Sequence, residues 1–153
     1  MPAGGRGEPG VDIAFSVHLP VDTDSVPFIR GLCRQALEHL DTERTVIDEM
    51  ALALTEACAN VVQHAGEHAE YEVEVAIDDR LCRISVVDSG EGFDPAALSG
   101  RDGGSPLDEG RGLLLMQALV DRLDFRHESD GRHRVTLEKR LAPHPPLRLV
   151  DPV

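Results

Sequence analysis

Three short segments that combine polar residues with glycine constrain this chain more than any other feature of its sequence. They are EACAN at residues 56–60, DSGEG at residues 88–92 and EGRGL at residues 109–113. The first lies inside a long helical pattern, the second follows an apolar strand pattern, and the third opens another helical pattern. A fold that brings the three together would gather carboxylates, an amide and flexible glycines in one place, which predicts a nucleotide-binding domain.

Composition predicts one domain with an aliphatic core. The chain has 153 residues, of which 41% are hydrophobic but only 3% aromatic. Its formal net charge of −13 argues against nucleic acid as a direct partner, because phosphate backbones would be repelled. The three cysteines (Cys33, Cys58 and Cys82) are far apart in apolar patterns, which is typical of reduced core residues and of a cytoplasmic protein. No apolar run reaches membrane-spanning length, so we expect no membrane association.

Hydrophobic periodicity predicts an α+β fold, a two-layer sandwich with a mainly antiparallel sheet and helices on one face. Residues 1–10 are predicted to be a flexible N-terminus, residues 11–141 the domain, and residues 142–153 an irregular proline-rich tail. The expected strands are 11–19, 71–77, 81–87, 125–128 and 134–141, and the expected helices are about 25–40, 43–65 and 113–123. Residues 90–112, rich in glycine and charge, are predicted to form a functional loop, often a lid.

Glu56 and Asn60 are the first candidate site residues. Their spacing of four places them on one face of the predicted second helix. Glutamate on a helix is ordinarily just solvated, but asparagine is a poor helix former and is unusual among apolar neighbours. The amide oxygen of Asn60 is a ligand that suits Mg²⁺, and Glu56 one turn earlier could orient or deprotonate an attacking hydroxyl.

Asp88 ends an apolar strand and is followed by Gly90 and Gly92. Such a segment is equally typical of an ordinary strand-to-loop turn. In a functional interpretation the two glycines let the backbone approach a flat ligand, and Asp88 accepts a hydrogen bond from an exocyclic amine.

Gly110, Arg111 and Gly112 precede an apolar helix that starts at Leu113. Free backbone N–H groups and the helix dipole could hold phosphate there, although a flexible loop end has the same composition. The spacing matches neither the P-loop nor the Rossmann pattern.

Other candidates carry weaker signals. Thr136 lies in an alternating strand and is ordinary there. His64 and His68 have the spacing of a helical metal pair, but Gly66 interrupts the helix and no third ligand is apparent, which disfavours zinc. Arg30 and Arg34 lie one turn apart and form either a solvated face or a face that docks a partner.

The three segments resemble the N, G1 and G2 boxes of the GHKL (Bergerat-fold) ATPases, and more narrowly those of the small bacterial anti-sigma factor serine/threonine kinases. The resembling stretches are LALTEACANVVQHA at residues 52–65, VVDSGEGF at 86–93 and EGRGLLLM at 109–116. The resemblance spans roughly residues 11–141. It implies the Bergerat ATP-binding fold, with ATP and Mg²⁺ as ligands.

The resemblance also implies a role for each matching residue. Glu56 would be the general base, Asn60 the Mg²⁺ ligand, and Asp88 the adenine-recognition residue. The remaining ATP-binding positions would be Gly90 and Gly92 beneath the base, Gly110, Arg111, Gly112 and Leu113 at the phosphates, residues 93–109 as lid, and Thr136 supporting Asp88. Arg30 would correspond to a first-helix contact with the partner protein.

As a whole, the resemblance implies an anti-sigma factor that phosphorylates a serine of its antagonist protein and so controls the availability of a sigma factor. The implied partners are the sigma factor and the antagonist, and the family is compatible with a homodimer. Two alternatives stay open. One is an ATP-binding regulatory module that transfers no phosphate, and the other is a detached histidine-kinase-like ATPase domain.

Overall fold

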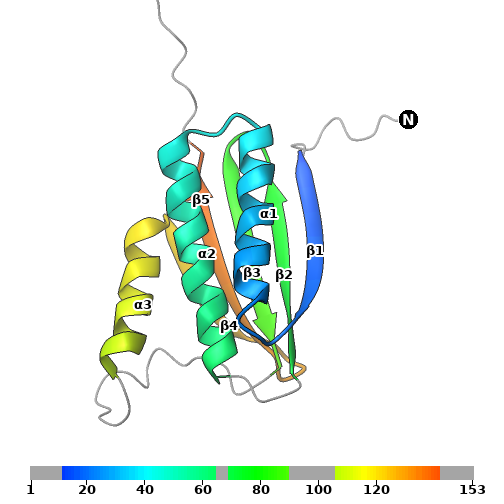
Figure 1. Ribbon diagram of the computed structural model, residues 1–153, viewed down its shortest axis with the longest axis vertical. Helices are drawn as coiled ribbons and strands as arrows, with labels where there is room; N and C mark the ends of the chain where they lie inside the picture. Colours follow the sequence, from blue (N-terminus) through cyan, green and yellow to red (C-terminus); the bar gives the residue numbers. More distant parts are fainter. Residues whose placement is uncertain (1–11, 65–68, 90–105, 142–153) are drawn as a thin grey trace, which may run out of the picture.

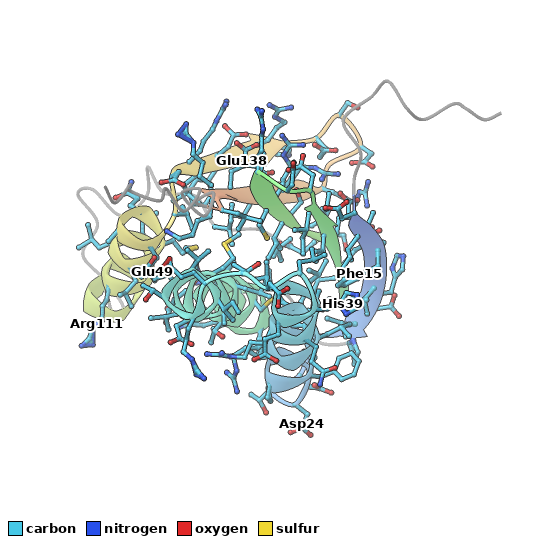
Figure 2. All side chains as sticks on the ribbon, turned by 90° about the horizontal axis from the view of Figure 1, so that it is seen from above. Phe15, Asp24, His39, Glu49, Arg111 and Glu138 are labelled. Atoms are coloured by element: carbon cyan, nitrogen blue, oxygen red, sulfur yellow. The ribbon has the colours of Figure 1, made fainter. Side chains whose placement is uncertain are left out.

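The computed structural model describes residues 12–64, 69–89 and 106–141, which form one antiparallel sheet covered by helices on one face (Figure 1). The helices α1, α2 and α3 lie side by side over the sheet, and the view from above shows them all on the same side (Figure 2). The elements in chain order are β1 (Ile13–Pro20), α1 (Ser25–His39), α2 (Arg44–His64), β2 (Glu70–Ile77), β3 (Leu81–Asp88), α3 (Pro106–Leu119), β4 (Arg122–His127) and β5 (His133–Arg140).

The five described strands follow the order β1-β2-β3-β5-β4, and every neighbouring pair is antiparallel. This confirms the predicted two-layer α+β sandwich. The turn from β2 to β3 is closed by Asp78, whose carboxylate accepts hydrogen bonds from the N–H groups of Arg80 and Leu81 at 2.7 and 2.8 Å. The turn from β4 to β5 uses Gly131 at φ 93°, a conformation that glycine adopts without strain.

The core lies between the helices and the sheet and is mainly aliphatic, as composition predicts. Burial alternates along β2, so that the odd-numbered residues from Tyr71 to Ile77 face the helices. The largest buried side chains come from both the helix layer and the sheet, namely Ile29, Leu37, Met50, Leu54, Tyr71, Ile77, Ile84, Met116 and Leu137. No helix in the described part of the chain is both long and apolar enough to cross a membrane.

The third helix differs most from the sequence prediction. It begins at Pro106 rather than at residue 113, so the end of the predicted lid and the following glycines are helical. Proline suits the first position of a helix, because its fixed φ is already helical and its missing N–H has no partner there anyway. The helix also ends earlier than predicted, at Leu119, and Leu123 belongs to β4. The predicted flexible N-terminus and irregular tail lie outside the described residues.

Candidate nucleotide-binding site

Glu56 and Asn60 lie on the face of α2 that meets α3, and Gly112 of α3 lies against both. A Cβ atom built on Gly112 would be 2.9 Å from Oε1 of Glu56 and 3.8 Å from Oδ1 of Asn60. The amide is buried, with 9% of Asn60 exposed, whereas Glu56 is half-buried. Two of the three segments singled out in the sequence therefore meet in space.

Gly112 is buried, and its missing side chain is what allows this close approach. A Cβ contact shorter than 3.0 Å is essentially never seen, so any larger residue would displace the carboxylate of Glu56. The glycine therefore leaves room for the Glu56 carboxylate between α2 and α3.

The remaining residues of this segment lie on α3 itself. Arg111 is exposed and projects from α3 into solvent (Figure 2). Gly110 lies inside the helix and Leu113 is half-buried. The backbone of Gly110, Arg111 and Gly112 thus belongs to the first half of a helix rather than to a free loop before it. The glycines Gly90 and Gly92 and most of the predicted lid lie outside the described residues.

Asp88 ends β3 and is buried, with 6% exposed. It faces the helices, because it shares strand parity with the core residues Ile84 and Val86. In the sheet register it stands opposite Tyr71 of β2 and His133 of β5. The contact of Asp88 with a ligand stays a prediction.

Tyr71 closes one side of Asp88. Its ring is buried, and its hydroxyl lies 2.6 Å from Oγ of Ser25, the first residue of α1. Burial raises the pKa of Tyr71 well above its ordinary value, so the phenol keeps its proton. The hydroxyl of Tyr71 is therefore held by Ser25 at the start of α1.

Thr136 does not lie where the predicted support for Asp88 requires it. It pairs with Ser85, and its hydroxyl is 3.1 Å from Oγ of Ser85. Both residues have the parity of the sheet face that points away from the helices, whereas Asp88 points toward them. The residue opposite Asp88 is His133, which sequence reasoning missed. Its position two residues after the turn glycine Gly131, at the start of the strand, would have offered it as a candidate.

Arg30 links α1 to α2 instead of extending freely. Its Nη1 lies 3.5 Å from Oγ1 of Thr55, which itself donates to the carbonyl of Ala51 at 2.8 Å. Arg34, one turn later, pairs with Asp48 at 2.7 Å. Both arginines contact α2 in the structure, and the partner role expected of Arg30 stays a prediction.

The donor set suits magnesium better than a transition metal. Within residues 12–64, 69–89 and 106–141, no group of three histidine, cysteine or acidic side chains is placed to hold a metal ion. His68, half of the predicted helical pair, lies outside that part. A single buried amide beside a carboxylate fits Mg²⁺, which takes one or two protein oxygens together with phosphate oxygens and water.

Comparison with known proteins identifies relatives of the whole described domain. A family profile described as the histidine kinase-like ATPase domain matches residues 19–139. The serine-protein kinase RsbW of Bacillus cereus strain G9842 is 28% identical over 125 residues, which cover 74% of this chain and 78% of that protein. RsbW of Bacillus cereus strain AH187 is 33% identical over 125 residues, with the same coverage.

Solved structures share the fold. The RsbU and RsbW domains of a Mycobacterium tuberculosis protein match with a TM-score of 0.60 and 22% identity, over 84% of this chain and 32% of that one. This chain thus spans about a third of that larger protein. A chain of the SiaB–SiaC complex from Pseudomonas aeruginosa matches with a TM-score of 0.56 and 17% identity, covering 86% of this chain and 91% of that one. The chain belongs to the histidine kinase-like (GHKL) ATPase family, and its relatives include the serine-protein kinases named RsbW.

Proposed function

We propose that this protein is an anti-sigma factor that uses ATP and Mg²⁺ to phosphorylate a serine of its antagonist protein. Transfer releases the phosphorylated antagonist and leaves the kinase free to hold the sigma factor. The family membership supports ATP use, and the relatives named serine-protein kinase support serine as the acceptor. The proposed site of action is the cytoplasm.

The observation that carries the proposal is the meeting of Glu56, Asn60 and Gly112 between α2 and α3. The carboxylate of Glu56, proposed for the acceptor hydroxyl, and the amide of Asn60, proposed for the cation, then lie next to each other. Gly112 lies opposite them and has no side chain that would fill the space. Phosphoryl transfer needs little covalent chemistry from the protein, so positioning and charge stabilisation supply most of the acceleration.

Each residue of this group has a separate task. Glu56 orients the acceptor serine and takes its proton as the new O–P bond forms. The bond between the γ-phosphorus and the β,γ-bridging oxygen of ATP breaks in the same step, and ADP leaves. Asn60 presents its amide oxygen to the cation. When bound, Mg²⁺ neutralises charge on the phosphate oxygens.

Adenine recognition is assigned to Asp88, which accepts a hydrogen bond from the exocyclic amine. Gly90 and Gly92 are proposed to lie beneath the base, and Gly110, Arg111, Gly112 and Leu113 near the phosphates. Since Gly110–Gly112 are helical, the N–H groups available to phosphate belong to the start of α3 rather than to those glycines. Thr136 is left out, because it faces away from Asp88.

The proposed partners are a sigma factor and a small antagonist protein, with Arg30 on α1 as a contact. A chain of the SiaB–SiaC complex, an assembly of two proteins, shares this fold, which supports a protein partner for this chain. A homodimer is part of the same proposal.

Incubation of the protein with γ-labelled ATP, Mg²⁺ and a purified antagonist candidate from the same organism tests the function. The wild type is expected to label the antagonist on serine, giving an acid-stable phosphate. Glu56→Gln is expected to lower the rate at least about 100-fold, the scale of a general-base contribution. Glu38→Gln, at an exposed position of α1, is the matched control and should transfer phosphate at the wild-type rate.

Three results would contradict parts of the proposal. Equal transfer by wild type and Glu56→Gln would remove the base assignment. Acid-labile label would indicate phosphohistidine and a histidine-kinase-like domain. Intact bound ATP after prolonged incubation with the antagonist would indicate a regulatory module that does not transfer phosphate.

A further inference from the structure

Four side chains that carry polar groups form a row across one end of the sheet. Tyr71 of β2 stands opposite Asp88 of β3, Asp88 stands opposite His133 of β5, and His133 stands opposite His127 of β4. Directly opposed residues in an antiparallel sheet have Cβ atoms about 4.5–5.5 Å apart, so adjacent members of the row are within side-chain reach.

The whole row faces the helix layer. Val135 and Leu137 have the parity of His133 on β5, and Leu123 has the parity of His127 on β4. These three apolar residues belong to the core or pack against it. The two histidines therefore lie on the same side of the sheet as Asp88.

The histidines contact each other. Their ring centroids are 4.4 Å apart and their planes are inclined by 43°. His133 is half-buried and His127 is exposed. In the register, His133 thus stands between Asp88 and His127, and its ring contacts that of His127.

The two flanks of Asp88 are unequal. Tyr71 is 2% exposed, and its hydroxyl is already engaged with Ser25. His133 keeps part of its surface open. A flat ligand that reaches the Asp88 carboxylate can therefore gain further contact with the open surface of His133.

We propose that His133 contacts the nucleobase bound at Asp88, and that His127 acts as a positioning residue for the His133 ring. The inference rests on the proposed function, since it takes an adenine nucleotide as the ligand of Asp88. Imidazole offers both a flat face and ring nitrogens, so it can pack against a purine and meet its polar edge.

Isothermal titration of the full chain with Mg·ATP and with magnesium tripolyphosphate tests the assignment, because tripolyphosphate lacks a base. His133→Ala is expected to weaken ATP binding about tenfold, the scale of losing one aromatic contact to a base, and to leave tripolyphosphate binding unchanged. His133→Phe keeps a flat ring and should recover most of the affinity. His39→Ala, in the last turn of α1, is the matched control and should bind both ligands like wild type.

His127 is tested by a double-mutant cycle in the same titration. If it acts through His133, His127→Ala weakens ATP binding in the wild-type background and has no effect in His133→Ala. Additive losses would contradict the positioning role. Thermal unfolding of each variant shows whether the sheet is intact.

The outcomes separate the inference from the function it rests on. Failure of the wild type to bind ATP would overturn the proposed function. Equal ATP affinity of the wild type and of His133→Ala would overturn only the inference. A loss of tripolyphosphate affinity equal to the loss of ATP affinity would also overturn it, because the residue would then act on the phosphates or on folding.

Discussion

Gly112 of α3 lies so close to Glu56 of α2 that a Cβ atom on the glycine would be 2.9 Å from Oε1 of the glutamate. The two residues are far apart in sequence and come from different helices. Their contact fixes where the Glu56 carboxylate lies relative to the first half of α3. A substitution of Gly112 therefore tests whether that position matters for activity.

Gly112→Ala is predicted to separate activity from stability. The new methyl group displaces a flexible carboxylate end rather than backbone, so the fold accommodates it. Alanine is also favoured over glycine in a helix by about 1 kcal/mol. We expect an unfolding free energy equal to or slightly above that of wild type, and phosphate transfer at least about tenfold slower because Glu56 is misplaced. Urea unfolding and the labelled-ATP assay measure the two effects.

Gly31→Ala is the matched control for that variant. Nothing lies within 4 Å of a Cβ built on Gly31 in α1. The substitution should therefore stabilise the protein by about 1 kcal/mol and leave ATP binding unchanged. If both glycine variants keep full transfer activity, the contact between Gly112 and Glu56 has no functional role.

Lys139→Met is predicted to destabilise the domain by loosening the end of α3. Nζ of Lys139 donates to the carbonyl of Leu119 at 2.7 Å and pairs with Glu49 at 2.9 Å, and only 12% of its side chain is exposed. Glu49 lies on the side of α2 that faces α3 (Figure 2). Losing a half-buried charged hydrogen bond costs about 1–3 kcal/mol, measurable by urea unfolding.

Arg34→Met is the comparison for Lys139→Met. It removes the exposed ion pair with Asp48 on the surface of α1 and α2. Exposed pairs contribute less than about 1 kcal/mol, so its effect should be clearly smaller. Equal losses of unfolding free energy in the two methionine variants would contradict the role of Lys139 in holding the end of α3.

The buried thiols are predicted to make stability fall at alkaline pH. Burial raises the pKa of Cys58 from 9.0 to about 12, although a hydrogen bond with Tyr71 partly offsets it. The folded state then keeps a proton that the unfolded state releases. Stability is therefore fully present below pH 9 and is lost as pH rises toward about 12, by at most about 1.4 kcal/mol per pH unit for each thiol.

Cys58→Ala isolates this contribution. The difference in unfolding free energy between wild type and the variant should shrink as pH rises above 9. Urea unfolding at several alkaline pH values measures it. Parallel pH profiles for the two proteins would show that Cys58 does not titrate differently in the folded and unfolded states.

Local pattern predicts the elements well where a residue's environment follows from its neighbours in sequence. The helical stripe predicts a second helix at 43–65, and α2 runs from Arg44 to His64. The alternation in 71–77 predicts β2 to within one residue. Both succeed because one face of each element packs on the core, which imposes a regular period.

Contacts between segments that are far apart in the sequence could not be predicted from it. Thr136 was expected beside Asp88, but strand pairing puts His133 there, and a register is set by contacts between distant segments. The early start of α3 was also missed, because glycines suggest a loop unless packing against α2 is known. That Gly112 meets Glu56 depends on the same helix packing.

The most direct test of the central claim is isothermal titration with ATP, with and without Mg²⁺, of wild type, Asp88→Asn and Asn60→Ala. We predict one ATP per chain with Mg²⁺, at least about tenfold weaker binding in Asp88→Asn through loss of a charged hydrogen bond, and little Mg²⁺ dependence in Asn60→Ala. Absence of binding in the wild type, or identical binding by all three proteins with the same Mg²⁺ dependence, would contradict the assigned site.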